Sequence, residues 1–177
     1  MTKAEGEAFG KLGNDVFLMI ESFPLPVIAA VNGFALGGGN ELAMSCDIRL
    51  CSDNAVFGQP EVGLGITPGF GGTQRLARLV GMGMAKQLVY SALNIKADEA
   101  YRIGLVNAVY PQAELMENVL KLANKIAKNR SHRRAQLQEG DQRRHQPPRS
   151  RRLSRSKRSC SATASRLMTR RKAWPAS

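Results

Sequence analysis

The sequence feature that most constrains the fold is a short apolar run followed by a cluster of glycines and a second strand-like run. Val27-Ile-Ala-Ala-Val31 is apolar and rich in β-branched residues, as in a strand buried inside a sheet, and Asn32-Gly33 marks its end. Gly37-Gly-Gly39 leads into a helix over residues 40–46, and residues 47–51 form a second strand. This unit of strand, glycine turn, helix and strand predicts an α/β fold.

Hydrophobic periodicity predicts helices on both sides of this unit. Apolar side chains recur at spacings of three and four residues over residues 4–22, and this helix ends at Pro24-Leu-Pro26. Residues 57–72 hold too many glycines and prolines for regular structure throughout, which predicts an ordered loop of the kind that is usually functional. Further elements are expected as helices over residues 73–80, 84–91, 97–103 and 112–128, and as a strand over residues 105–110.

The charge of the chain changes abruptly near residue 129. Residues 1–129 hold 11 Lys and Arg against 12 Asp and Glu, whereas residues 130–177 hold 15 against 2, so the net charge of +12 belongs to the tail. The tail has few aliphatic residues and no helix or strand period, so it cannot bury a core and is expected to be disordered. We therefore predict two parts, an α/β core over residues 1–129 and an arginine-rich tail over residues 130–177.

A basic tail makes nucleic acid a candidate partner through nonspecific phosphate contacts. The tail contains no RNA-binding motif and its one aromatic residue is Trp174, so nucleic-acid binding is kept as the alternative from a different functional class. No apolar stretch reaches the length of a membrane span, and the N-terminus lacks an apolar signal segment. We expect a cytoplasmic protein that binds no membrane.

Most familiar catalytic motifs are missing from residues 1–129. Both histidines, His132 and His145, lie in the tail, which excludes a histidine-based triad from the core. The three cysteines form no CxxC pair, so neither a zinc site nor a disulfide is expected. No dinucleotide or phosphate-loop glycine fingerprint is complete. Carboxylates are the side chains that remain for chemistry.

The glycine triplet is the first half of the candidate site. Glycines at the start of a helix let the backbone approach a ligand closely, and the first N–H groups of a helix have no partner within it. Such groups can point at an oxygen that becomes negative during a reaction. The structural alternative is that the glycines only allow the strand and the helix to pack tightly.

Two glutamates are the second half of the candidate site. Glu41 lies just inside the helix that follows the triplet, and Glu61 lies in the glycine-rich loop after Gln59-Pro60. Taken singly, each is more simply explained as a solvated acid. The strand predicted between them returns the chain to the same sheet edge, so together they form a candidate acid/base pair, whose pKa values can differ in a partly apolar pocket.

These segments resemble the enoyl-CoA hydratase/isomerase (crotonase) family. The resemblance rests on residues 26–47, which include Gly33-Phe-Ala-Leu-Gly-Gly-Gly-Asn-Glu41, on Phe57-Gly-Gln-Pro-Glu61, and on Gly65-Ile-Thr-Pro-Gly-Phe-Gly-Gly-Thr-Gln-Arg-Leu76. It extends over residues 5–129 and implies a crotonase-like ββα superhelix. The implied activity is that of a hydro-lyase, the reversible hydration of a short-chain trans-2-enoyl-CoA to a 3-hydroxyacyl-CoA in fatty-acid or butanoate metabolism.

The resemblance assigns roles to five residues. Glu41 and Glu61 match the two glutamates that hold the attacking water, where Glu41 helps to activate it for addition to C3 and Glu61 delivers the proton to C2. Gly38 matches the residue whose N–H forms half of the oxyanion hole for the thioester carbonyl, and Gly37 and Gly69 match substrate-binding positions. The family implies no metal and no cofactor beyond the coenzyme A of the substrate, and a homo-trimer or homo-hexamer. An isomerase of the same family is a second alternative, although isomerases commonly keep only one of the two glutamates or neither.

The sequence departs from the family pattern at three places. Asn40 stands where many hydratases have cysteine. Family members begin several dozen residues earlier with a loop that supplies the other oxyanion N–H, so we expect this chain to be truncated at its N-terminus and impaired as an enzyme. They also continue with helices in place of the arginine-rich tail, and we hypothesise a frameshift near residue 129. Sequencing the gene would disprove it if no single-base shift restored an apolar, helical continuation.

Overall fold

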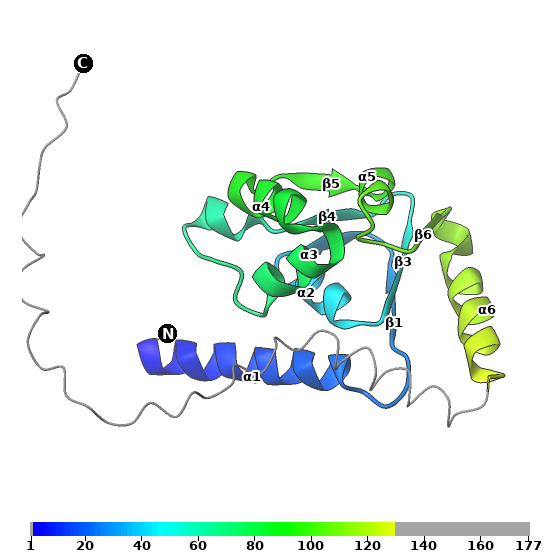
Figure 1. Ribbon diagram of the computed structural model, residues 1–177, viewed down its shortest axis with the longest axis horizontal. Helices are drawn as coiled ribbons and strands as arrows, with labels where there is room; N and C mark the ends of the chain where they lie inside the picture. Colours follow the sequence, from blue (N-terminus) through cyan, green and yellow to red (C-terminus); the bar gives the residue numbers. More distant parts are fainter. Residues whose placement is uncertain (1, 130–177) are drawn as a thin grey trace, which may run out of the picture.

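The computed structural model describes residues 2–129, which form two small sheets surrounded by helices (Figure 1). The predicted tail, residues 130–177, lies outside the described residues. The first sheet is parallel throughout, with the spatial order β1 (Ile28–Val31), β3 (Ile48–Ser52) and β6 (Ala108–Tyr110). In the second sheet β2 and β4 are parallel and β5 is antiparallel to β4, with the order β2 (Phe34–Leu36), β4 (Val56–Gly58) and β5 (Asn94–Lys96).

Within residues 2–129, six α-helices and two short 3₁₀ helices cover these sheets. They are α1 (Lys3–Glu21), α2 (Gly38–Ser45), α3 (Gly72–Val80), α4 (Met82–Ser91), α5 (Ala97–Arg102) and α6 (Leu115–Ala127), with η1 (Pro60–Leu64) and η2 (Gln112–Glu114). Helix α1 lies along α2 and α3 on one side of the molecule, and α6 packs on the first sheet (Figure 1). Among the described residues, no helix combines the length and apolar character that crossing a membrane requires.

Helix α1 is well defined at its start. The Thr2 hydroxyl accepts a hydrogen bond from the Glu5 backbone N–H, and the Glu5 carboxylate accepts one from the Thr2 N–H. This capping box satisfies donors that the first turn of a helix leaves free. The sequence prediction of a helix over residues 4–22 is confirmed.

The chain winds as a spiral that alternates between the two sheets. One turn runs through β1, β2 and α2, and the next runs through β3, β4 and η1. The strands of successive turns pair in parallel, with Ile28 opposite Ile48 in the first sheet and Phe34 opposite Val56 in the second. Equivalent positions of the two turns therefore lie side by side.

Strand β3 is the centre of the first sheet and is buried on both faces. Leu50 packs with Leu115 and Val119 of α6, whereas Cys51 points into the main core, which also holds Phe57. The strand therefore buries successive residues, and its one charged side chain, Arg49, is buried through hydrogen bonds that it donates to the carbonyls of Leu105 and Cys46.

Three expectations from the sequence need correction. Val27–Val31 was predicted as a buried inner strand, but among the described residues β1 is a half-buried edge strand that pairs with β3 alone. The predicted loop over residues 57–72 contains the end of β4 and the helix η1. The strand predicted over residues 105–110 is only the three-residue β6, because Leu105 and Val106 turn into the core beside α5. Strands β2 and β5, of three residues each, are too short for a period to reveal them.

Replacing Phe57 by alanine should lower the free energy of unfolding by about 3–5 kcal/mol, because removal of this large side chain would leave a cavity in a packed core. Phe57 is 0% exposed. Phe34 is the matched control, because it lies on the adjacent strand and is 81% exposed, so Phe34→Ala should change stability by less than about 0.5 kcal/mol. Urea unfolding measures both, and equal losses would contradict this description of the core.

Candidate active site

The pairing of β2 with β4 brings the two predicted glutamates together. Leu36, the last residue of β2, lies opposite Gly58, the last residue of β4, and the Gly37 N–H donates to the Gly58 carbonyl at 3.0 Å. Each strand is followed at once by a helix, α2 with Glu41 in its first turn and η1 with Glu61 in its first turn. Both carboxyl groups are thus presented at the same end of the strand pair.

Glu41 is buried and held by the backbone. Its side chain is 1% exposed, and its Oε1 accepts hydrogen bonds from the N–H of Phe70 at 2.9 Å and of Gly72 at 2.7 Å. A buried carboxylate requires such donors to offset the loss of water. Because both bonds end on Oε1, the orientation of the carboxyl group is fixed and Oε2 is left for another donor.

Glu61 is also buried but is held differently. It is 8% exposed, and its Oε2 has no hydrogen-bond partner within residues 2–129. Burial raises the pKa of this carboxyl above the ordinary value of 4.5, and the charge of Glu41 acts in the same direction, whereas a hydrogen bond from the Glu61 backbone opposes them. The two glutamates therefore sit close enough to interact in environments that differ.

Gly37 allows the close approach of Glu61 to α2. Its φ of +53° lies in the region that favours glycine, and a Cβ at this position would lie 2.9 Å from Glu61 Oε1. The predicted substrate-binding role of Gly37 is not visible in these contacts. What the structure shows is that the absent side chain makes room for the second glutamate.

Gly38, the predicted oxyanion residue, is the first residue of α2. The earliest helical hydrogen bond of α2 runs from the Glu41 N–H to the Gly37 carbonyl at 2.9 Å. The N–H groups of Gly38, Gly39 and Asn40 precede it and have no backbone acceptor in the described part of the chain. The Phe70 ring lies beside Gly38, 3.5 Å from the place where a Cβ would be.

The side-chain amides of Asn40, in α2, and of Gln59, the residue before η1, lie against each other. Asn40 Nδ2 lies 3.0 Å from Gln59 Oε1, and both side chains are buried. Asn40 precedes Glu41 by one residue and Gln59 precedes Glu61 by two, so this contact links the two segments that carry the carboxylates. Asn40 Oδ1, like Glu61 Oε2, has no partner within the described residues.

Gly69, the fifth predicted residue, lies in the turn that precedes α3. Its carbonyl accepts a hydrogen bond from Asn14 Nδ2 at 2.8 Å, and no atom lies within 4 Å of the place where its Cβ would be. The predicted contact with substrate stays a prediction. Over residues 2–129, no three His, Cys, Asp or Glu side chains are grouped as metal ligands.

Sequence reasoning missed the backbone donors to Glu41. An N–H group leaves no mark on residue type, but Gly72 carries an indirect signal, since a Cβ there would lie 2.3 Å from Gln59 Nε2 and 2.8 Å from Glu41 Oε1. The glycines around Phe70 could therefore have indicated a turn packed against a side chain.

Glu61→Gln should become more stable relative to the wild type as the pH rises above 4.5, the ordinary value of the carboxyl pKa. Because the pKa of Glu61 is higher in the folded state, the folded protein binds more protons than the unfolded protein above pH 4.5, and stability falls as the pH rises through this window. Glutamine does not titrate and escapes this loss. Urea unfolding of both proteins across the pH range measures the difference, and a difference that is constant or of opposite sign would contradict the assignment.

Sequence comparisons identify the relatives of this chain. The profile of the enoyl-CoA hydratase/isomerase family matches residues 1–172. The short-chain-enoyl-CoA hydratase of Clostridium acetobutylicum is 70% identical over 129 residues, which cover 73% of this chain and 49% of that protein. The crotonyl-CoA hydratase of Syntrophomonas wolfei subsp. wolfei is 65% identical over 126 residues, covering 71% and 48%. The chain spans about half the length of the curated relatives it matches.

Solved structures agree with this relationship. An enoyl-CoA hydratase from Bacillus anthracis superposes with a TM-score of 0.79 at 42% identity, covering 80% of this chain and 55% of that one. DspI from Pseudomonas aeruginosa gives a TM-score of 0.80 at 35% identity, covering 84% and 61%. The predicted α/β, crotonase-like fold is confirmed. The chain belongs to the enoyl-CoA hydratase/isomerase family.

Proposed function

We propose that this chain carries the acid/base half of a short-chain enoyl-CoA hydratase, a hydro-lyase that adds water reversibly across C2 and C3 of a trans-2-enoyl-CoA to give a 3-hydroxyacyl-CoA. The names of the two relatives support this substrate class. The observation that carries the proposal is the pair of buried glutamates, one held by two backbone donors and the other with an unpartnered buried oxygen.

Glu41 is the proposed base. Its Oε1 is occupied by two N–H donors, so Oε2 is the oxygen that can accept a hydrogen bond from a water. As the water oxygen forms its bond to C3, the proton that it loses passes to this carboxylate. The fixed orientation of Glu41 keeps that water on one line of approach to C3.

Glu61 is the proposed acid. The raised pKa of its carboxyl favours the protonated form, which suits a group that delivers a proton to C2 as the double bond opens. One turnover leaves Glu41 protonated and Glu61 ionised, and transfer of one proton between them through the next water restores the starting state. The hydrogen-bonding difference between the two carboxyls thus matches two different roles.

Gly38 is proposed to bind the thioester carbonyl. Its N–H lies at the start of α2, free of any helical acceptor, where it can stabilise the negative charge that develops on the carbonyl oxygen. One such donor contributes about 3–4 kcal/mol to catalysis in a site that excludes water. Gly37 and Gly69 are proposed to line the substrate-binding site, and coenzyme A enters as part of the substrate.

The division at residue 129, the homo-oligomer and the cytoplasmic location stay predictions.

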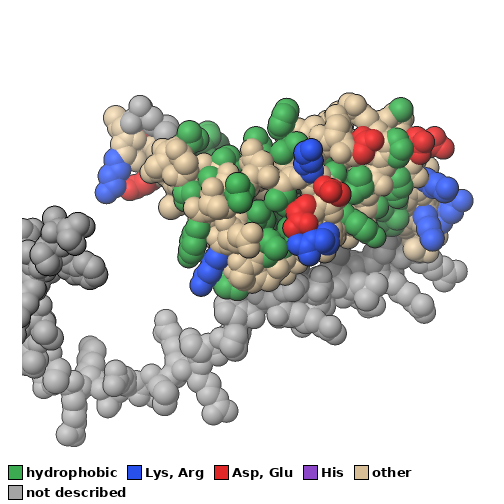
Figure 2. All heavy atoms as spheres, turned by 90° about the horizontal axis from the view of Figure 1, so that it is seen from above, with side chains coloured by type: hydrophobic (Ala, Val, Ile, Leu, Met, Phe, Trp, Pro, Cys, Tyr) green, Lys and Arg blue, Asp and Glu red, His purple; other side chains and the backbone are tan. Residues whose placement is uncertain are grey.

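Two alternatives from the sequence are less well supported. An isomerase moves a double bond with one proton-transfer group, whereas here two buried carboxyls share a site. Nucleic-acid binding was predicted for residues 130–177, which lie outside the described residues. On the face of the core shown in Figure 2, acidic and basic side chains are interspersed, so no basic patch extends over it.

Glu41→Gln and Glu61→Gln should each lower the kcat for hydration of crotonyl-CoA by about 10²–10⁴, because each removes one proton-transfer step. Loss of the absorbance of the conjugated enoyl thioester measures the rate. Both substitutions keep the shape of the side chain, so the variants should fold. Urea unfolding checks that they do.

Glu117→Gln is the matched control, since Glu117 is an exposed acid in the first turn of α6, and it should leave the rate unchanged. A folded wild-type protein that does not hydrate crotonyl-CoA would overturn the proposed function. Conversion of a 3-enoyl-CoA to the 2-enoyl isomer without hydration would favour the isomerase instead.

A further inference from the structure

The turn over residues 69–72 controls where Glu41 points. The N–H groups of Phe70 and Gly72 are the two donors to Glu41 Oε1. Phe70 belongs to no helix or strand, and Gly72 is the first residue of α3. A displacement of this turn would rotate or release the Glu41 carboxyl group. The orientation of the Glu41 carboxyl group therefore depends on the contacts that hold this turn in place.

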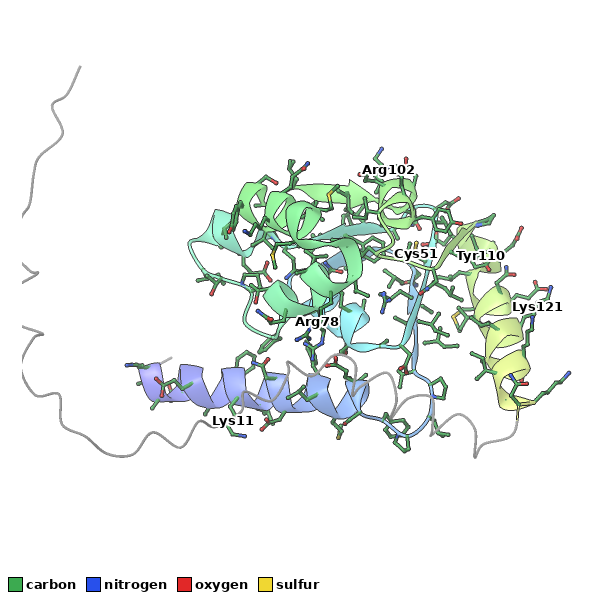
Figure 3. All side chains as sticks on the ribbon, viewed as in Figure 1. Lys11, Cys51, Arg78, Arg102, Tyr110 and Lys121 are labelled. Carbon is green, nitrogen blue, oxygen red and sulfur yellow. The ribbon has the colours of Figure 1, made fainter. Side chains whose placement is uncertain are left out.

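Helix α1 holds the turn from outside. Asn14 Nδ2 donates to the Gly69 carbonyl at 2.8 Å. The Phe70 ring makes edge-to-face contacts with Phe9, at 5.7 Å between ring centroids, and with Phe17, at 5.5 Å. None of the residues of α1 is fully buried, so this helix adds little to the hydrophobic core and directs its inner side at the turn. Lys11 points away from α2 and α3 and marks its outer side (Figure 3).

Arg75 closes the connection between α1 and the turn. It is 6% exposed, and its Nη1 donates to the Phe70 carbonyl at 2.7 Å while its Nη2 lies 2.8 Å from Oε2 of Glu21 in α1. A guanidinium presents its donors in a fixed fork, so one arm can hold the turn while the other holds the helix. The peptide groups on both sides of Phe70 are thereby fixed, its carbonyl by Arg75 and its N–H by Glu41.

We propose that α1 and Arg75 form a clamp that positions Glu41 by fixing its two backbone donors, with Asn14, Glu21 and Arg75 as positioning residues rather than catalytic ones. The kinetic part of this inference rests on the proposed hydratase function. The structural part, that α1 immobilises the amides of Phe70 and Gly72, does not.

Two glycines of α1 provide a matched test. A Cβ at Gly13 would lie 2.3 Å from Phe70 Cε1, so Gly13→Ala must displace the Phe70 ring, whereas nothing lies within 4 Å of the same position at Gly10. Both substitutions place alanine in the same helix, where it is the better helix former. Any difference between the two variants therefore reports on the turn and not on the helix.

Gly13→Ala should speed hydrogen exchange of the Phe70 and Gly72 amides in the full chain, measured by NMR. It should also lower kcat about 10- to 100-fold, with KM changed less than about threefold, because the clamp positions a reacting group without touching substrate. Gly10→Ala should match the wild type in both measurements.

Asn14→Ala and Arg75→Gln remove the polar contacts of the clamp and should act in the same direction as Gly13→Ala, while Arg75→Lys should restore only part of the loss, since lysine cannot hold both partners with one fork. Asn14→Ala leaves the buried Arg75 in place, so it still tests the clamp if Arg75→Gln does not fold. Lys11→Ala, on the outer side of α1, should have no effect on either measurement.

Unchanged exchange of the Phe70 and Gly72 amides in Gly13→Ala and Asn14→Ala would overturn the clamp, as would faster exchange with an unchanged kcat in an active enzyme. If the wild type does not hydrate crotonyl-CoA, the proposed function fails, and the exchange rates alone decide whether α1 immobilises the two amides.

Discussion

The parallel pairing of β2 with β4 is the constraint on which the rest of the site depends. Leu36 opposite Gly58 places the starts of α2 and η1 beside each other, and each helix carries its glutamate in the first turn. Because the side chains of a strand alternate between faces, a slip of one residue would turn the fully buried Phe57 out of the core. The burial of apolar side chains therefore fixes the register, and the register fixes the distance between the carboxyls.

The site contains two buried acids whose hydrogen bonding differs. Glu41 receives two backbone N–H groups on one oxygen, whereas Glu61 keeps a buried oxygen without a partner and has a raised pKa. Burial and the nearby charge of Glu41 favour a proton on Glu61. In the proposed reaction this difference lets one residue type serve as both base and acid. The proposed clamp adds that the inequality depends on α1, an element remote in sequence from both glutamates.

Much of this arrangement could be predicted from the sequence, because it depends on residue type. The apolar runs indicated strands, the glycine triplet indicated a helix start, and the strand predicted between Glu41 and Glu61 indicated a shared sheet edge. The donors from Phe70 and Gly72 could not be predicted, since every residue except proline has an N–H group and only the fold decides where it points. The edge position of β1 was missed because an apolar run does not reveal how many neighbours a strand has. Arg75, as a charged residue, would have been expected at the surface. It is buried because its guanidinium binds Glu21, which is far away in the sequence, and the backbone carbonyl of Phe70, which residue type does not reveal.

The central claim is that Glu41 and Glu61 act together on one water, and a double-mutant cycle in kcat tests it most directly. If the two carboxyls form one unit, the Glu41→Gln/Glu61→Gln double variant should be slower than the worse single variant by no more than about threefold, since removing either member already disables the pair. If the two losses instead multiply, the glutamates act independently and the account of a shared acid/base pair is wrong.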